Sequence, residues 1–148
     1  MPAPDGGFEL THELELARSP DAVFALLADP ESFRAVDPAL IDYGPRGPLA
    51  AGAEGWFKHR RGGMTANTTW RVTELDAPTR LEVAISGSGY RMTESAYLEA
   101  TAAGTRAVFI DRVWPTSLPG RILVALSSGI MRRDLRDRAA RLKALLEA

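Results

Sequence analysis

Apolar and polar side chains alternate along most of the chain, and this alternation predicts a sheet of antiparallel strands. In segment 8–16, Phe8, Leu10 and Leu16 alternate with acidic and hydroxyl side chains, which is typical of a half-buried strand. Six further strands are predicted at 40–43, 55–61, 64–75, 80–86, 90–100 and 105–114. The last five are joined by short turns such as Ser88-Gly89, and no segment of helical period separates them, so an antiparallel meander is expected.

Two short helices are predicted between the first and second strands. Ser19 can cap the first helix, and Pro20 suits its first position. Pro30 ends that helix, and a second one is expected over 31–36, before Pro38.

One long closing helix is predicted over 118–147. Segment 122–126 is apolar on every side, whereas the helix is amphipathic beyond Gly129. At 100° per residue the two apolar stripes do not align through Gly129, so a kink or a local break is expected there. The first half is expected to lie against the mouth of the sheet.

Turn lengths decide which side chains share a face of the sheet, because side-chain direction alternates with a period of two. The turn at Ser88-Gly89 pairs Val83 with Glu94, and the turn over 101–104 pairs Glu94 with Asp111. One face then collects these two acids and eleven apolar residues: Trp70, Val72, Leu81, Val83, Ile85, Met92, Ala96, Leu98, Ala107, Phe109 and Val113.

The composition argues against several classes of function and partner for this chain. The chain has 148 residues, which suits a flexible N-terminus (1–7) followed by one domain (8–148). A net charge of −1 and the lack of a nucleic-acid-binding motif give no reason to expect a nucleic-acid partner. The absence of cysteine excludes disulfides and a cysteine nucleophile, and two histidines make a histidine-rich metal site improbable, so neither metal nor cofactor is expected. No signal peptide or 18-residue apolar run is found, so we expect a cytoplasmic protein without an integral membrane segment.

The two acids are the main candidates for chemistry. Side by side on an apolar face, Glu94 and Asp111 cannot both ionise easily, so at least one pKa should rise. A carboxylic acid that is neutral near pH 7 can donate a proton to a carbonyl compound, as dehydration and aldol closure require. His12 is expected on the same face of the first strand. Alternatively, a bulge turns one acid outward, or Arg91 or Arg112 neutralises it.

These elements resemble the START-like helix-grip (SRPBCC) superfamily, and in particular its bacterial polyketide cyclase/dehydrase branch. The resemblance is carried by the terminal helix and by segments 19–30, 47–52, 70–81 and 104–106. It implies an α+β helix-grip fold, in which a seven-stranded curved antiparallel sheet wraps around a long C-terminal helix and encloses a hydrophobic cavity. Cyclases, lipid carriers and quinone-binding proteins share this fold. The matching motifs are structural, so no catalytic residue is carried over.

We therefore expect a small hydrophobic ligand of polyketide, fatty or isoprenoid type between the sheet and the last helix. If the protein is an enzyme, Glu94 and Asp111 are the expected acid and base, and His12 or Tyr90 orients the substrate. The aromatic candidates can stack on a planar ligand or simply fill the core. The candidate ligand-binding residues are Trp70, Val83, Ile85, Tyr90, Met92, Leu98, Phe109, Ile122 and Leu126.

Other interpretations remain open from the sequence. The protein can be a non-catalytic lipid or quinone carrier, or an interaction module that uses the apolar half of the last helix. A homodimer and a contact with an acyl-carrier protein are also open. His59 lies in the basic run 58–61 beside Gly62-Gly63; a solvated hairpin tip is expected, although it could meet an anionic headgroup or a carrier protein.

Overall fold

The computed structural model describes residues 6–147, without the side chain of Arg61. Residues 1–5 of the segment that was predicted to be flexible lie outside the described residues. The elements, in chain order, are β1 (Phe8–Leu16), α1 (Pro20–Leu27), α2 (Pro30–Val36), β2 (Leu40–Gly44), β3 (Glu54–Arg61), β4 (Met64–Asp76), β5 (Arg80–Gly87), β6 (Tyr90–Thr101), β7 (Gly104–Pro115) and α3 (Leu118–Glu147).

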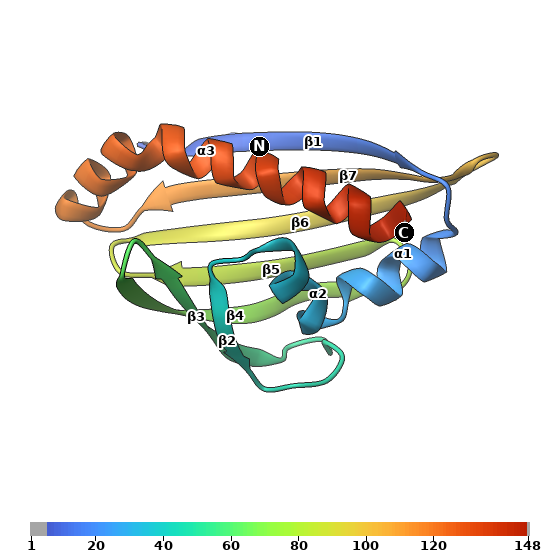
Figure 1. The fold of residues 1–148 in the computed structure, drawn as a ribbon, viewed down its shortest axis with the longest axis horizontal. Coiled ribbons are helices and arrows are strands. Elements are labelled where there is room, and N and C mark those ends of the chain that lie inside the picture. Colours follow the sequence, from blue (N-terminus) through green and yellow to red (C-terminus); the bar gives the residue numbers. More distant parts are fainter. Residues whose placement is uncertain (1–5, 148) are drawn as a thin grey trace.

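All seven strands form one antiparallel sheet in the order β1-β7-β6-β5-β4-β3-β2. The sheet curves, and α3 lies across its inner face, with α1 and α2 beside the C-terminal end of α3 (Figure 1). This arrangement confirms the predicted α+β helix-grip fold. None of the described helices combines the length and the apolar character needed to cross a membrane.

The two short helices begin where side-chain oxygens cap them. The hydroxyl of Ser19 accepts a hydrogen bond from the Ala22 amide at 3.2 Å, and the carboxylate of Asp29 accepts one from the Glu31 amide at 3.0 Å. A proline follows each cap, and its fixed φ suits the first helical position. The second helix therefore begins one residue earlier than predicted, at Pro30.

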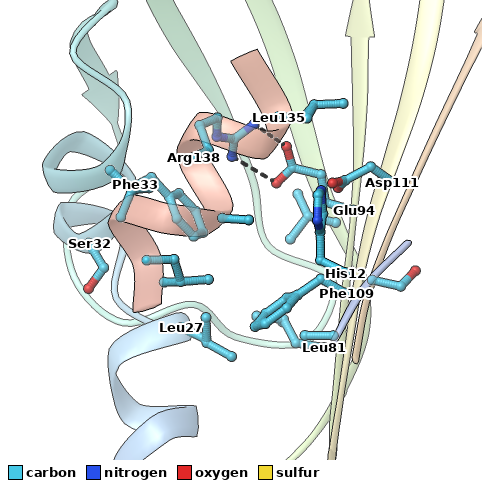
Figure 2. A pocket seen from close by; sticks show the side chains of 16 residues that line it. His12, Leu27, Ser32, Phe33, Leu81, Glu94, Phe109, Asp111, Leu135 and Arg138 are labelled. Atoms are coloured by element: carbon cyan, nitrogen blue, oxygen red, sulfur yellow. Dashed lines mark hydrogen bonds and ion pairs between the residues drawn. The ribbon is translucent and has the colours of Figure 1, made fainter. Parts of the chain in front are cut away.

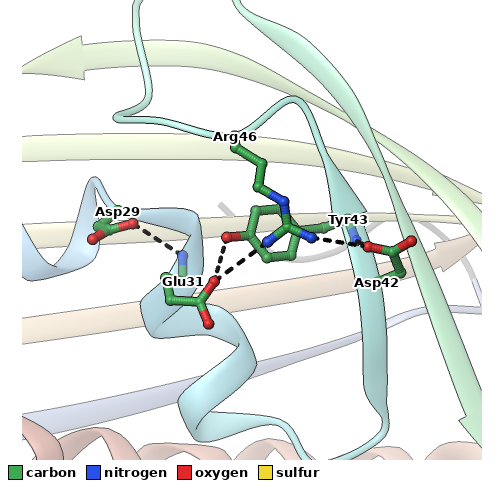
Figure 3. A network of polar contacts seen from close by, with 5 residues as sticks. All are labelled: Asp29, Glu31, Asp42, Tyr43 and Arg46. Atoms are coloured by element: carbon green, nitrogen blue, oxygen red, sulfur yellow. Dashed lines mark hydrogen bonds and ion pairs between the residues drawn. The ribbon is translucent and has the colours of Figure 1, made fainter.

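A polar network attaches α2 to β2 (Figure 3). The hydroxyl of Tyr43 donates to the carboxylate of Glu31, and this hydrogen bond raises the pKa of the phenol. The guanidinium of Arg46 lies 4.5 Å above the Tyr43 ring and contacts Glu31 at 3.6 Å and Asp42 at 3.2 Å. Phe33 of the same helix lies in the wall of both interior cavities.

Helix α3 is continuous from Leu118 to Glu147, so of the two alternatives expected at Gly129 the local break is wrong, and the kink stays a prediction. A glycine inside a helix costs about 1 kcal/mol relative to alanine, which tertiary packing on both sides can offset. Here Val124 anchors the first half in the core and Leu135 anchors the second. Among the residues of the apolar segment, Val124 turns inward, whereas Ile122 and Leu126 face solvent.

The predicted strand register is confirmed from β4 to β7. Glu94 pairs with Asp111, and ten of the eleven apolar residues expected on the inner face are buried, while Phe109 is partly buried. The strands predicted at 64–75 and 80–86 leave a four-residue turn over 76–79, whereas Asp76 pairs with Arg80 and the turn has only three residues. A bulge between Val72 and Glu74 compensates, so that the pairs closer to the centre of the sheet keep the predicted register.

Candidate functional site

Two adjoining cavities lie between the inner face of the sheet and helices α2 and α3. The smaller has a volume of about 90 Å³ and the larger about 290 Å³. Four residues line both of them: Phe33, Glu94, Leu135 and Arg138. The side chains of Glu94 and Arg138 therefore stand at the junction of the two cavities.

The smaller cavity combines an apolar wall with a cluster of ionisable side chains. Leu81, Val83 and Phe109 are among its apolar lining. The cluster draws one residue from each of four elements: His12 from β1, Glu94 from β6, Asp111 from β7 and Arg138 from α3. Figure 2 shows these four side chains gathered together, with Phe109 and Leu81 below them.

Glu94 and Arg138 form a bidentate ion pair at the junction of the two cavities. The Nη1–Oε1 distance is 2.8 Å and the Nη2–Oε2 distance is 3.3 Å (Figure 2). The side chain of Arg138 is 25% exposed and that of Glu94 is 23% exposed. Burial opposes the charged guanidinium, but the carboxylates of Glu94 and Asp111 together raise the pKa of Arg138. The arginine therefore keeps its charge in the interior.

Asp111 is the acid that holds a proton near neutral pH. It lies opposite Glu94 in the β6–β7 pair. Burial, and then the negative charge of Glu94, raise its pKa to about 7, while Arg138 acts in the opposite direction. This is the behaviour predicted for one member of the acid pair, and it allows Asp111 to give or take a proton at physiological pH.

His12 completes the cluster as a neutral side chain. It pairs with Phe109 across β1 and β7, on the face expected from the sequence. Burial, and then the positive charge of Arg136, lower its pKa, so the imidazole is uncharged at pH 7. Its Nε2 atom is buried and has no hydrogen-bond partner among the described residues. The structure thus brings together all three residues predicted for catalysis.

The larger cavity contains a histidine whose position differs from the expectation. His59 is only 20% exposed, lines this cavity, and places Nε2 3.3 Å from Oδ2 of the buried Asp37. Its ring packs edge-on against Phe57, which also lines the cavity. Strand alternation puts Phe57 and His59 on the inner face, so His59 is not part of a solvated tip. Within residues 6–147, no three histidine, aspartate or glutamate side chains are grouped to hold a metal ion.

The nine predicted ligand-binding residues are divided among four places. Val83 and Phe109 line the smaller cavity. Ile85, Tyr90 and Met92 line the larger one. Trp70 and Leu98 are buried in the core and line neither cavity. Ile122 and Leu126 are exposed on α3 and also line neither cavity, so these two candidates do not contact the interior in which the ligand was expected.

Arg138 is the important residue that the sequence interpretation missed. In one of the alternatives, Arg91 or Arg112 neutralised one of the acids, but Arg112 pairs with Glu9, with Nε and Oε2 2.6 Å apart. The signal for Arg138 was present in the sequence. It lies three residues after Leu135 and four before Leu142, so it belongs to the apolar stripe that faces the sheet. A charge on such a stripe indicates a buried partner.

Comparisons with known proteins agree with this architecture. Residues 7–147 match the family model described as polyketide cyclase / dehydrase and lipid transport. No curated protein matches the chain.

Solved structures share the fold at low sequence identity. The Zhui aromatase/cyclase from Streptomyces sp. R1128 is 12% identical, with a TM-score of 0.75 over 95% of this chain and 93% of that one. A protein from Rhizobium leguminosarum is 16% identical, with a TM-score of 0.73 over 95% and 94%. A protein from Thermus thermophilus is 17% identical, with a TM-score of 0.71 over 92% and 94%. These structures support the fold alone, whereas the family model spans nearly the whole described chain, which therefore belongs to the polyketide cyclase / dehydrase and lipid transport family.

Proposed function

We propose that the protein binds a small hydrophobic molecule carrying carbonyl or hydroxyl oxygens, and catalyses its cofactor-free dehydration or cyclisation. The observation that carries this proposal is Asp111, an acid with a pKa of about 7 that lines an apolar cavity. General acid–base catalysis is most efficient when the catalytic pKa lies near the working pH. Arg138 and His12 line the same cavity and can hold the reacting oxygen atoms.

Three unpartnered polar atoms favour an oxygen-bearing ligand over a plain hydrocarbon chain. Nε2 of His12, Nε of Arg138 and Oγ1 of Thr68 are buried without a hydrogen-bond partner among the described residues. His12 lines the smaller cavity, Arg138 lines both cavities, and Thr68 lines the larger one. Leaving such a group unpaired costs about 1–3 kcal/mol. A polyketide-type ligand with oxygens along its length can pair several of these atoms, whereas a fatty or isoprenoid chain pairs few.

The cluster can carry out a balanced dehydration of a β-hydroxy carbonyl compound. Asp111 as the carboxylate takes the proton from the carbon between the carbonyl and the hydroxyl-bearing carbon. The enolate oxygen that forms accepts a hydrogen bond from the Arg138 guanidinium, whose fixed charge stabilises it. The carbon–oxygen bond then breaks, Asp111 returns its proton to the departing hydroxide, and water leaves. The apolar wall keeps bulk water away from the enolate.

A non-catalytic carrier is the second candidate. The specific observation in its favour is the bidentate ion pair between Glu94 and Arg138, because a carboxylate that is already paired with a guanidinium can have a purely structural role. In that case the cavities would hold and release a ligand without changing it. A cytoplasmic location, a homodimer and a contact with an acyl-carrier protein stay predictions.

Identification of the natural ligand is the first step of the test. Native mass spectrometry of the purified protein would identify a bound compound, and related β-hydroxy carbonyl compounds would then be offered as substrates. For the enzyme, Asp111→Asn keeps binding but loses turnover, whereas Glu99→Gln, which changes an exposed acid of β6, keeps both. Tight binding without turnover in the unchanged protein would instead establish the carrier.

A further inference from the structure

A ridge of large apolar side chains is exposed on the first half of α3. It consists of Leu118, Ile122, Leu126 and Ile130, which are spaced four residues apart and therefore lie along one side of the helix. These side chains are 56% to 82% exposed, and Leu123 beside them is 49% exposed. Scattered exposed apolar residues are common on proteins, but a continuous group of this kind indicates a binding surface.

The ridge borders the larger cavity. Ile130 belongs to the ridge and also lines that cavity, together with its neighbours Ser127 and Met131. On the other side of the same cavity, His59 and Ala66 come from the hairpin of β3 and β4. Near the tip of this hairpin, Met64 is 78% exposed. The first half of α3 and the tip of this hairpin lie at the same end of the molecule (left in Figure 1).

The first half of α3 and the tip of the β3–β4 hairpin both carry basic side chains and no acidic ones. Residues 118–133 contain three arginines and no acid, and residues 58–64 contain Lys58, two arginines and no acid, although the whole chain has a net charge of −1. Arg121 and Arg133 on α3 are exposed beside the ridge, and Arg60 is exposed on the hairpin. An apolar helix face flanked by arginines is the pattern of a helix that lies in the interface of an anionic membrane.

We propose that this end of the molecule docks on an anionic lipid membrane. The ridge enters the boundary between headgroups and acyl chains, and Arg121 and Arg133 contact the lipid phosphates. The larger cavity then faces the membrane, from which an apolar ligand can enter. The proposal does not depend on what happens to the ligand inside.

A second copy of the chain fits this surface less well. In a two-fold dimer the same patch of both subunits forms the interface, so Arg121 and Arg133 of both subunits would be brought together with no acid from residues 118–133 to pair with them. An acidic protein would pair with the arginines, but it would also have to supply an apolar groove for five large aliphatic side chains. A lipid bilayer offers negative charge and hydrocarbon together.

Vesicle flotation tests the proposal without knowledge of the ligand. The protein should bind vesicles of phosphatidylcholine mixed with phosphatidylglycerol, should bind less to phosphatidylcholine alone, and should be released as salt is raised. Arg133→Gln should weaken partitioning about fivefold, as expected for one basic residue at the surface. Leu126→Gln should weaken it about tenfold or more, because the apolar contact is lost.

Arg141→Gln is the matched control, since it makes the same charge change at an exposed position in the second half of α3. It should leave partitioning nearly unchanged, and the substituted proteins should melt at the same temperature as the parent because the replaced side chains are exposed. The proposal is overturned if the protein stays unbound to anionic vesicles, or if Arg141→Gln acts as strongly as Arg133→Gln. It is also overturned if sedimentation shows a dimer that Leu126→Gln dissociates, or if an acidic carrier protein binds through Arg133 while vesicles do not.

Discussion

Replacement of Asp111 by asparagine should change how stability depends on pH. Burial and the charge of Glu94 raise the pKa of this carboxyl from 3.8 in the unfolded chain to about 7 in the folded protein. Between these values the folded state binds a proton that the unfolded state has lost, so the free energy of unfolding falls as pH rises through this window. Across about three pH units the loss is on the order of 4 kcal/mol. Asparagine cannot ionise and therefore avoids this loss.

Urea unfolding at a series of pH values measures the effect. The quantity to follow is the change with pH in the free energy of unfolding of Asp111→Asn minus that of the parent, because a constant effect of the amide cancels from this change. This difference should rise by on the order of 4 kcal/mol from about pH 4 to about pH 8, in favour of the variant. Glu99→Gln, at an exposed position, should give a difference that hardly changes with pH.

A pH-independent difference for Asp111→Asn would refute the reasoning. It would mean that the carboxyl titrates alike in the folded and unfolded chain, and the proposed proton transfer at neutral pH would lose its basis. If the stabilised variant also loses turnover, Asp111 is a functional residue that is kept although it destabilises the fold at neutral pH.

The strands and their register could be predicted because short turns constrain both. The turn at Ser88-Gly89 sets the pairing of Val83 with Glu94, and the turn over 101–104 sets the pairing of Glu94 with Asp111, because side-chain direction has a period of two. The pairing of β4 with β5 was predicted with the wrong turn length. It agreed near the centre of the sheet only because the bulge after Val72 adds the residue that the turn lacks.

The partner of Glu94 could not be predicted from strand patterns, because it depends on how α3 is rotated over the sheet. The alternation of apolar and polar residues places the acids on one face of the sheet, but it does not determine which residue of α3 lies opposite them. Arg138 was detectable only as a charge on an apolar stripe.

The exposure of the first half of α3 depends in the same way on how the helix lies over the sheet. Its all-apolar segment was expected to lie against the mouth of the sheet, and only Val124 of this segment is buried in the core. The remaining large apolar side chains of this segment, Ile122, Leu123 and Leu126, are exposed, and the proposed membrane contact would account for them. His59 was misplaced because its basic neighbours suggested a surface, whereas strand alternation turns it inward beside Phe57.

Two further substitution pairs test the packing of α3. Gly129→Ala should stabilise the fold by about 1 kcal/mol, because the glycine is exposed inside a continuous helix, whereas Gly120→Ala should destabilise it by about 1–3 kcal/mol through a clash with the Gly89 backbone. Destabilisation by both changes in urea unfolding would contradict a regular helix at Gly129. Arg138→Met should cost about 3 kcal/mol at neutral pH, because it leaves the Glu94 carboxylate unpaired in the interior. Adding Glu94→Gln removes that stranded charge, so the double variant should recover most of the loss. Strictly additive losses in this double-mutant cycle would show that the ion pair carries no coupling energy, and that the junction of the two cavities is held by packing alone.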